Sequence, residues 1–397
     1  MSTDVFLNAA SAWSALGVSA SEMRANVFSA TDPHTLRMTE QYSPGRVLAL
    51  GCLPEHAALP AIDFAPAWQR SRNNALAWAA MQDIRGAVDA AIARHGPERV
   101  ALIVGTSTGG LDEGTLAAAA HRQTGQFPEG FNYSAQELGD VAAFLGTHLG
   151  IKGPVHTIST ACSSGAKALA SAARMLRSGM VDAVVAGGVD ALSSFTVAGF
   201  SALEAVSAER CNPLSAHRHG INLGEAAAFF VVSREAGPVR LAGWGETQDA
   251  HHMSAPDPTG RGAQSAMQQA LDRAGMTAPQ IDYINLHGTA TPHNDAMESL
   301  AVHALFGRDV AVSSTKPLTG HALAAAGALE AAIAWHVLQD NPDGKLPVHW
   351  WDGVPDPALP EVRVVAPGAR LGRPVRAVLS NSFAFGGNNS ALLFAAA

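Results

Sequence analysis

The sequence of 397 residues predicts an α/β fold built from alternating layers of helices and buried sheets. Short apolar runs rich in β-branched residues, which are typical of strands, alternate with alanine-rich segments of helical length. Apolar residues make up 47% of the chain and charged residues 15%, against about 25% charged residues in typical soluble domains. Much surface must therefore be buried, and a subunit interface is the simplest place for part of it.

Seven apolar runs are the predicted strands of the sheets, at 99–104, 181–186, 226–232, 281–286, 310–314, 375–379 and 391–394. The first three belong to one half of the chain and the last four to the other. A strand, a cysteine and a helix at 155–176 parallel a strand, a histidine and a helix at 310–338, which indicates a loose internal repeat. Turn residues follow a completed strand at 236–238, so we place the boundary between a domain of residues 1–236 and one of residues 237–397.

Cys162 is predicted to lie where a strand ends and the first turn of a helix begins. Unpaired amides and the positive end of the helix dipole favour a thiolate at such a position. We therefore expect a lowered pKa for Cys162 and a role as nucleophile. A lone cysteine is more often a small buried apolar residue, so this assignment requires partner residues elsewhere in the chain.

Two histidines are the predicted partners of Cys162. His287 ends the strand at 281–286, and His321 stands at the predicted start of an apolar helix that extends to about residue 338. A cysteine and two histidines at three similar strand ends form a candidate catalytic group. Both His287 and His321 lie in the predicted domain of residues 237–397, so this C-terminal domain is expected to supply both partners of Cys162.

The segment at 105–109 offers a competing nucleophile, because Gly-Thr-Ser-Thr-Gly matches the G-x-S-x-G turn of serine hydrolases. Ser107 would be the nucleophile, with Asp295 and His321 following in the hydrolase order. The residues after 109 are not expected to begin the helix that this turn requires. The hydrolase hypothesis also leaves Cys162 without a function.

Four motifs in order resemble those of the β-ketoacyl-acyl carrier protein synthases: Thr-Ala-Cys-Ser-Ser-Gly at 160–165, His-Gly-Thr-Ala-Thr at 287–291, Ser-Thr-Lys-Pro-Leu-Thr-Gly-His at 314–321, and Asn-Ser-Phe-Ala-Phe-Gly-Gly-Asn-Asn at 381–389. The resemblance extends from residue 5 to residue 393. It implies the thiolase fold, a duplicated αβαβα unit with five layers. It also implies decarboxylative condensation of a malonyl thioester with an acyl chain on Cys162, in fatty acid or polyene and polyketide biosynthesis. The substrates would be carried on the phosphopantetheine arm of acyl carrier protein, with no permanently bound cofactor.

The resemblance also implies a role for each site residue. Cys162 is the nucleophile, and its backbone amide and that of Phe385 stabilise the oxyanion. As neutral imidazoles, His287 and His321 stabilise the enolate, and a helix N-terminus is expected to disfavour the charged form of His321. Lys316 and Glu330 match a buried ion pair, which either supports the two histidines or is purely structural. The remaining implied residues are Phe383, Gly386 and Gly387 in a gating loop; Thr289 and Thr291 at the pantetheine arm; and Thr108 and Phe200 at the acyl pocket. Asn294 and Asp295 are expected to hold the turn after His287.

Several positions depart from the pattern of the common fatty-acid enzymes. Leu214, Ser215, His217 and His219 stand where an aromatic-Asp pair and acidic residues are usual, and Ala290 and Ala384 replace glycines. These differences indicate a divergent subgroup, similar to condensing enzymes of aryl polyene or related pigment pathways. The expected partners are acyl carrier protein and a second subunit, in a homodimer or a heterodimer with a chain-length-factor-like chain. The chain could also be the chain-length-factor-like subunit itself, which lacks the nucleophile. The presence of Cys162 argues against this hypothesis.

Composition excludes several other classes of protein. A net charge of −8 with no run of Lys and Arg argues against a nucleic-acid partner. Cys52, Cys162 and Cys211 are too few and too scattered for a disulfide framework or a zinc site, which indicates a reducing compartment and hence the cytoplasm. The apolar stretch at 321–338 contains Glu330 and His336, so we expect a buried helix and no membrane span. No metal is expected, because the pairs His217/His219 and His251/His252 lack a third ligand at a suitable spacing.

Overall fold

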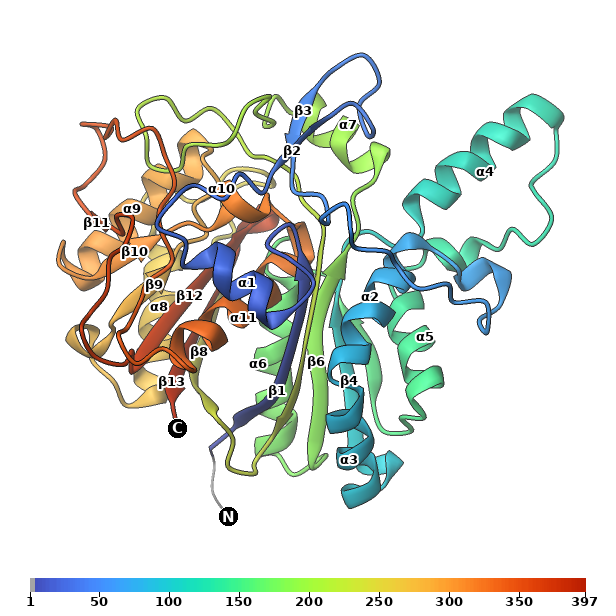
Figure 1. Ribbon diagram of the computed structural model, residues 1–397, viewed down its shortest axis with the longest axis horizontal. Helices are drawn as coiled ribbons and strands as arrows, with labels where there is room; N and C mark the ends of the chain where they lie inside the picture. The colour runs from blue at the N-terminus through green and yellow to red at the C-terminus, as the bar shows by residue number, and fades with distance from the viewer. Residues whose placement is uncertain (1–3) are drawn as a thin grey trace.

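The computed structural model describes residues 4–397 and confirms the α/β class (Figure 1). Within these residues, eleven strands form one strongly bent sheet in the order β11-β10-β9-β12-β13-β8-β1-β7-β6-β4-β5, and β2 and β3 form a small separate ribbon. The strands are β1 (Phe6–Ser14), β2 (Arg37–Thr39), β3 (Leu48–Leu50), β4 (Val100–Gly105), β5 (Val155–Ile158), β6 (Ala183–Asp190), β7 (Ala226–Ser233), β8 (Val239–Gln248), β9 (Tyr283–Asn285), β10 (Ala311–Ser313), β11 (Arg363–Val364), β12 (Ala377–Ala384) and β13 (Asn388–Ala396).

The two halves of the sheet repeat one topology. In the first half β5, β4 and β6 are parallel, and β7 and β1 continue the sheet antiparallel. In the second half β10, β9 and β12 are parallel, and β13 and β8 continue it antiparallel. Strands β1 and β8 join the halves through Phe6↔Arg240 and Leu7↔Val239. The structure thus shows a duplicated unit, while the boundary at residues 236/237 stays a prediction.

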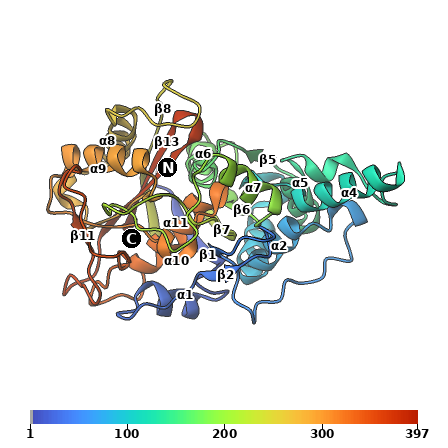
Figure 2. The ribbon, with the colours of Figure 1, turned by 90° about the horizontal axis from the view of Figure 1, so that it is seen from above.

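The helices complete five layers (Figure 2). Helices α6 and α11 pack on each other between the two halves of the sheet; α2, α3 and α5 cover the outer face of the first half, and α8, with α9 beside it, covers that of the second. The helices are α1 (Ala20–Val27), α2 (Arg72–Asp83), α3 (Arg85–His95), α4 (Leu111–Thr124), α5 (Asp140–Leu149), α6 (Ser164–Arg177), α7 (Ser194–Ala202), α8 (Arg261–Ala274), α9 (Pro292–Phe306), α10 (Lys316–Thr319) and α11 (Ala326–Leu338). Helix α4 projects from the body (Figure 1).

Two glycines allow the central helices to approach closely. A Cβ atom on Gly165 would lie 2.9 Å from the carbonyl oxygen of Ala324, and one on Gly327 would lie 2.9 Å from the amide of Ala166. Both distances are shorter than real Cβ contacts, so any larger residue would push α6 and α11 apart. This close packing brings the start of α6, next to Cys162, against the segment that precedes α11 and carries His321.

Helix α11 is almost wholly buried, as the sequence predicts for 321–338, but it begins at Ala326 after a 3-10 turn over Leu323–Ala325. Among residues 4–397, no helix combines the length and the apolar character needed to cross a bilayer. Cys52, Cys162 and Cys211 are buried and form no disulfide.

Candidate active site

Cys162 occupies a sharp turn between β5 and α6. The preceding residue, Ala161, has φ of +52°, a conformation that non-glycine residues rarely adopt. Helix α6 begins at Ser164 with Ser163 as its N-cap, so Cys162 lies just before the helix and not in its first turn as predicted. Strained turns of this kind are concentrated at functional sites, because the surrounding structure must hold them.

The expected lowering of the Cys162 pKa is wrong. Burial raises the pKa of this thiol to about 12, because only 7% of the residue is exposed and the thiolate loses its hydration. The charge of Lys316 lowers the pKa, Asp190 raises it, and the backbone amides of Phe385 and Cys162 lower it through hydrogen bonds to the sulfur. Cys162 is therefore a protonated thiol that needs a base, and the two amides proposed for the oxyanion already face its sulfur.

His321 lies against this thiol, with 3.0 Å between Nε2 and the Sγ of Cys162. It is five residues before the first residue of α11, so its predicted position at the N-terminus of that helix is wrong. Burial and then the charge of Lys316 hold the pKa of His321 well below its usual value. His321 is thus a neutral imidazole, as the sequence predicts. The cause is burial and the charge of Lys316, and not a helix N-terminus.

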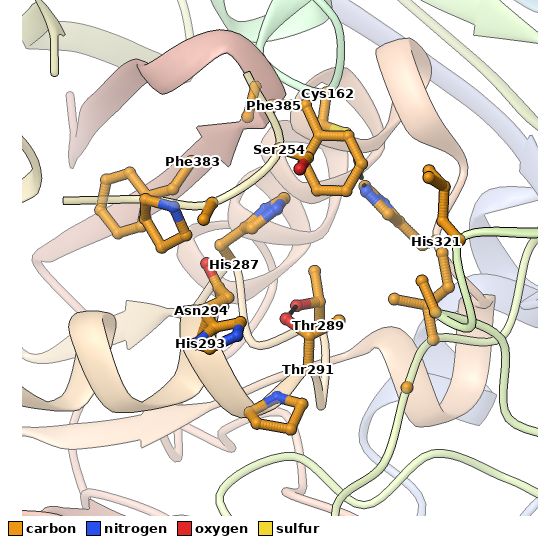
Figure 3. A pocket seen from close by; sticks show the side chains of 18 of the residues that line it. Cys162, Ser254, His287, Thr289, Thr291, His293, Asn294, His321, Phe383 and Phe385 are labelled. Atoms are coloured by element: carbon orange, nitrogen blue, oxygen red, sulfur yellow. Dashed lines mark hydrogen bonds between the residues drawn. The ribbon is translucent and has the colours of Figure 1, made fainter. Parts of the chain in front are cut away.

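His287 follows β9, and its ring centroid lies 5.2 Å from that of His321. Burial, Lys316 and His321 together hold the pKa of His287 well below its usual value. Figure 3 shows the two imidazole rings on either side of the space next to the Cys162 thiol. The Nδ1 atoms of both rings are buried and make no hydrogen bond to any residue from 4 to 397.

Glu298 of α9, which the sequence did not suggest, fixes the turn that carries His287. Its carboxylate accepts hydrogen bonds from the backbone amides of His287 at 2.8 Å and Gly288 at 2.7 Å. Asp295 holds the next part of the turn, accepting from the amides of Ala290 and Leu214, as predicted for this residue. Ala290 has φ of +64°, which explains why a glycine suits that position.

We expect Glu298→Ala to lower the free energy of unfolding by about 2–4 kcal/mol, because two buried amides lose their acceptor. Glu298→Gln keeps one acceptor oxygen and is expected to cost about half as much. Urea denaturation of the three proteins measures both values. Equal stability of the Ala variant and the parent would show that this carboxylate does not hold the turn.

Lys316 and Glu330 form a buried ion pair with 2.6 Å between Nζ and Oε1, and the two residues are 2% and 3% exposed. Burial raises the pKa of Glu330 to about 6, opposed by Lys316. The charge of Lys316 also lowers the pKa of all three candidate catalytic residues. The pair therefore acts electrostatically on the site, although its role in the reaction stays a prediction.

Asp190 at the end of β6 is a second residue that sequence reasoning missed. Its buried carboxylate accepts hydrogen bonds from the hydroxyls of Thr106, Ser107 and Thr108, and from the amide of Ala324 next to the His321 segment. It thereby joins the loop after β4 to the segment that carries His321. An acidic residue that ends a fully apolar strand was the available sequence signal.

The same contacts weigh against the serine hydrolase hypothesis. Helix α4 does begin at Leu111, so the expectation that no helix follows residues 105–109 is wrong. However, the Ser107 hydroxyl donates to Asp190 at 2.5 Å and has no histidine partner among residues 4–397, while Nε2 of His321 contacts Cys162. Among the described residues, Ser107 therefore lacks the histidine contact that the nucleophile of a serine hydrolase needs.

Two cavities meet at Cys162. The first, about 530 Å³, is lined by Thr289, Thr291, Phe383, His287 and His321, among others. The second, about 460 Å³, is lined by Ser107, Thr108, Leu111, Phe195 and Leu323, among others. Cys162, Phe200, Leu203 and Phe385 line both, and the rings of Phe200 and Phe385 are 5.9 Å apart.

Most of the predicted site residues thus lie at these cavities, with four exceptions. Lys316 and Glu330, the buried ion pair, line neither cavity. Gly386 and Gly387 do not line either cavity; they form the turn between β12 and β13, with φ of +79° and +74°. The roles of all these residues in substrate binding and gating stay predictions.

Within residues 4–397, the one group of three or more potential metal ligands is Cys162, His287 and His321, whose ligand atoms lie within 4.8 Å of one another. These three residues are the candidate catalytic group itself. His217, which was considered above as a possible metal ligand, contacts Asp352 at 2.8 Å.

Comparisons with known proteins match this arrangement. The family model "Beta-ketoacyl synthase, N-terminal domain" matches residues 72–237, and "Beta-ketoacyl synthase, C-terminal domain" matches residues 239–342. The mitochondrial 3-oxoacyl-[acyl-carrier-protein] synthase of Arabidopsis thaliana is 37% identical over 267 residues, which is 62% of this chain and 57% of that protein. The 3-oxoacyl-[acyl-carrier-protein] synthase 2 of Staphylococcus aureus is 32% identical over 315 residues, 75% of this chain and 77% of that one.

A solved structure is similar to this chain over almost its whole length. The ketosynthase ApeO of Xenorhabdus doucetiae, solved in complex with its chain length factor ApeC, superposes with a TM-score of 0.90 at 42% identity, covering 99% of this chain and 98% of that one. The fold is thus the predicted thiolase fold. Both family models match, and ligand atoms of the cysteine and the two histidines lie within 4.8 Å of one another. The chain therefore belongs to the β-ketoacyl synthases, acyltransferases that form carbon-carbon bonds.

Proposed function

We propose that this protein condenses a malonyl thioester with an acyl chain bound to Cys162, both delivered on the phosphopantetheine arm of acyl carrier protein. The observation that carries the proposal is the 3.0 Å contact between Cys162 Sγ and His321 Nε2 at the junction of two cavities. One cavity suits the pantetheine arm, because hydroxyl and imidazole groups line it. The other suits an acyl chain, because most of its wall is apolar.

In the first half-reaction the Cys162 sulfur adds to the acyl thioester carbonyl. The amides of Cys162 and Phe385, which face the sulfur, stabilise the oxyanion. The bond between the acyl carbon and the carrier sulfur then breaks. The thiol proton ends on the departing carrier thiol, and His321, in contact with Sγ, is the group placed to transfer it.

In the second half-reaction malonyl thioester loses carbon dioxide, and the enolate oxygen accepts hydrogen bonds from His287 and His321. Because both imidazoles are neutral, they stabilise the enolate without protonating its carbon. The carbon attacks the acyl group on Cys162, a carbon-carbon bond forms, and the bond to Sγ breaks. The released Cys162 thiolate takes up one proton from solvent, which restores the thiol. The product is a 3-oxoacyl chain two carbons longer on the carrier.

Incubation with acyl- and malonyl-loaded carrier protein, followed by mass spectrometry of the carrier, tests this function. We expect a 3-oxoacyl product together with stoichiometric carbon dioxide. Hydrolysis to free acid without condensation would contradict the proposal.

We further propose that a chain-length-factor-like subunit completes the acyl cavity, in an aryl polyene or pigment-type pathway. The second cavity is lined by Phe195 and Leu203, which are 63% and 59% exposed, and α4 beside it carries Leu116, which is 70% exposed. Exposed apolar groups of this kind mark subunit interfaces. The departures at 214–219 support the pathway, and the complex of ApeO with its chain length factor supports the type of partner.

We expect the chain to form a heterodimer of one-to-one stoichiometry when it is co-expressed with such a subunit. Leu116→Glu should weaken that heterodimer, because it places a charge in an apolar interface. Light scattering after size-exclusion chromatography measures the stoichiometry, with Thr115→Glu, at an exposed neighbouring position of α4, as the matched control. A stable homodimer that excludes the second subunit would contradict this part of the proposal.

We expect Thr108→Phe to shift the preference of the enzyme towards shorter acyl chains. Thr108 is 2% exposed and lines the second cavity, so a larger side chain fills part of the space for the acyl group. Acylation rates across a series of acyl lengths, with malonyl decarboxylation as an internal control, measure the shift. An equal fall for every length would place Thr108 outside the acyl pocket.

A further inference from the structure

Asp190, the last residue of β6, has a buried carboxylate on which two segments of the site converge. The residue is 1% exposed and accepts six hydrogen bonds, three from backbone amides and three from hydroxyls. A buried charge is unfavourable unless it is hydrogen-bonded, and only a carboxylate offers two acceptor oxygens without a competing donor. An asparagine here would have one acceptor oxygen, and its amino group would face amides that cannot accept. The set of donors therefore matches the residue type found at this position.

The Oδ1 atom of Asp190 holds the loop after β4. It accepts from the amide of Ser107 at 2.7 Å and from the Thr106 hydroxyl at 2.8 Å. It also accepts from the hydroxyl of Thr108 at 3.0 Å and from the amide of that residue at 3.1 Å. Thr108 lines the second cavity, which we assign to the acyl chain. Asp190 thus fixes the side chain that forms part of the wall of this cavity.

The Oδ2 atom of Asp190 holds the segment that carries His321. It accepts from the amide of Ala324, three residues after His321, at 2.8 Å. The same oxygen accepts from the Ser107 hydroxyl at 2.5 Å, so the loop and the segment share one acceptor. Asp190 thereby supports the position in which Nε2 of His321 lies 3.0 Å from the Cys162 sulfur.

The place of Asp190 in the sheet explains how one side chain reaches both segments. Strand β6 pairs in parallel with β4, so the carboxyl ends of the two strands meet at the same edge of the sheet (Figure 1). The 3-10 turn over Leu323–Ala325 packs against β6. The end of β6 therefore lies between the loop after β4 and the segment after His321.

The charge of Asp190 also acts on the nucleophile. It raises the pKa of the Cys162 thiol, against the lowering effect of Lys316. Burial raises the pKa of Asp190 itself, and its hydrogen bonds lower it. The other titratable side chains that lie close to the thiol are His287 and His321. Loss of the Asp190 charge is therefore expected to lower the pKa of Cys162.

We propose that Asp190 is a positioning residue that aligns the acyl cavity with the Cys162–His321 pair, so that the choice of acyl chain and the rate of acyl transfer depend on one carboxylate. This inference rests on the proposed function, and it adds a residue that lines neither cavity. Asp190 acts through Thr108 and Ala324, which it holds by hydrogen bonds.

The first test compares Asp190→Asn with a matched control, Asp140→Asn. Asp140 is also buried, accepts from Gln69 at 2.8 Å and Asn74 at 2.7 Å, and lines neither cavity. Single-turnover acylation of Cys162 is measured with carrier-bound chains of several lengths. We expect Asp190→Asn to slow acylation about 10²-fold, the effect of a misplacement of about 1 Å, and to weaken the preference among chain lengths. The control should keep the parental rate and preference.

A second measurement separates this role from a general loss of structure. The pH dependence of Cys162 alkylation by iodoacetamide should shift to lower pH in Asp190→Asn, because the thiol loses a neighbouring negative charge. Slower acylation together with alkylation at lower pH is a result that an unfolded or merely destabilised protein would not give. Asp140→Asn should be alkylated with the parental pH dependence.

Asp190→Glu keeps the carboxylate and displaces it by one methylene, so it tests position without removing the charge. It should be alkylated with the parental pH dependence and yet show an altered chain-length preference. A parental chain-length preference in both Asp190 variants, or acylation of Asp190→Asn as fast as that of Asp140→Asn, would overturn the positioning role and leave the proposed function intact. A parent that no carrier-bound chain acylates would overturn both.

Discussion

Replacing Cys162 with alanine is expected to lower the rates of acyl-enzyme formation and condensation by at least about 10⁴-fold. Release of carbon dioxide from malonyl carrier protein is expected to persist. Acyl transfer needs the sulfur to form a covalent bond. Decarboxylation needs only donors for the enolate oxygen, and these are the two histidines beside the thiol. Radiolabelled carbon dioxide release and condensation, measured on the same preparation, separate the two steps.

Cys52→Ala is the matched control, because Cys52 is also a buried cysteine in the free thiol form but lies outside both active-site cavities. It should retain both half-reactions. Condensation at the parental rate by the Cys162→Ala protein would assign the nucleophile to another residue. A Cys162→Gln variant, whose amide resembles an acylated side chain, should decarboxylate at least as well as the Ala variant.

Replacing the two histidines is expected to give unequal results. Either His287→Ala or His321→Ala should slow decarboxylation by about 10²- to 10³-fold, since each removes one donor to the enolate. Only His321→Ala should also slow acylation strongly. Its ring is the one in contact with Sγ, and the raised pKa of Cys162 leaves the thiol dependent on a base.

Single-turnover acylation and carbon dioxide release for each variant measure this asymmetry. Acylation is the step at which the two variants are expected to differ, because only His321 contacts Sγ. Thermal unfolding of both variants serves as the control for folding. Equal acylation by His321→Ala and the parent would remove His321 from the first half-reaction.

The strands that the sequence predicted best are those buried on both faces. Residues of β4, β6 and β7 are buried throughout, so they form continuous apolar runs that stand out in the sequence. Strands β1 and β8 were missed because they mix apolar residues with serine, asparagine, glycine and charged residues. These two strands join the halves of the sheet, a position that only the tertiary structure defines.

The catalytic residue types were predictable because their motifs are local, whereas their environments were not. The pKa of Cys162 depends on how deeply the fold buries it, and burial outweighs the nearby amides and Lys316. His321 appeared to start a helix because the apolar run is continuous, yet the 3-10 turn over Leu323–Ala325 separates the two. Glu298 and Asp190 were missed because their partners come from other segments of the chain, through contacts that no spacing in the sequence reveals.

The most direct test of the account is the intact mass of the protein after incubation with acyl-loaded carrier protein, followed by peptide mapping. The account predicts a mass increase of one acyl group, located on the peptide that contains Cys162 and prevented by prior treatment with iodoacetamide. A serine-directed fluorophosphonate should leave this acylation unchanged. Acylation or fluorophosphonate labelling at Ser107, with Cys162 unmodified, would contradict the assignment of Cys162 as the nucleophile.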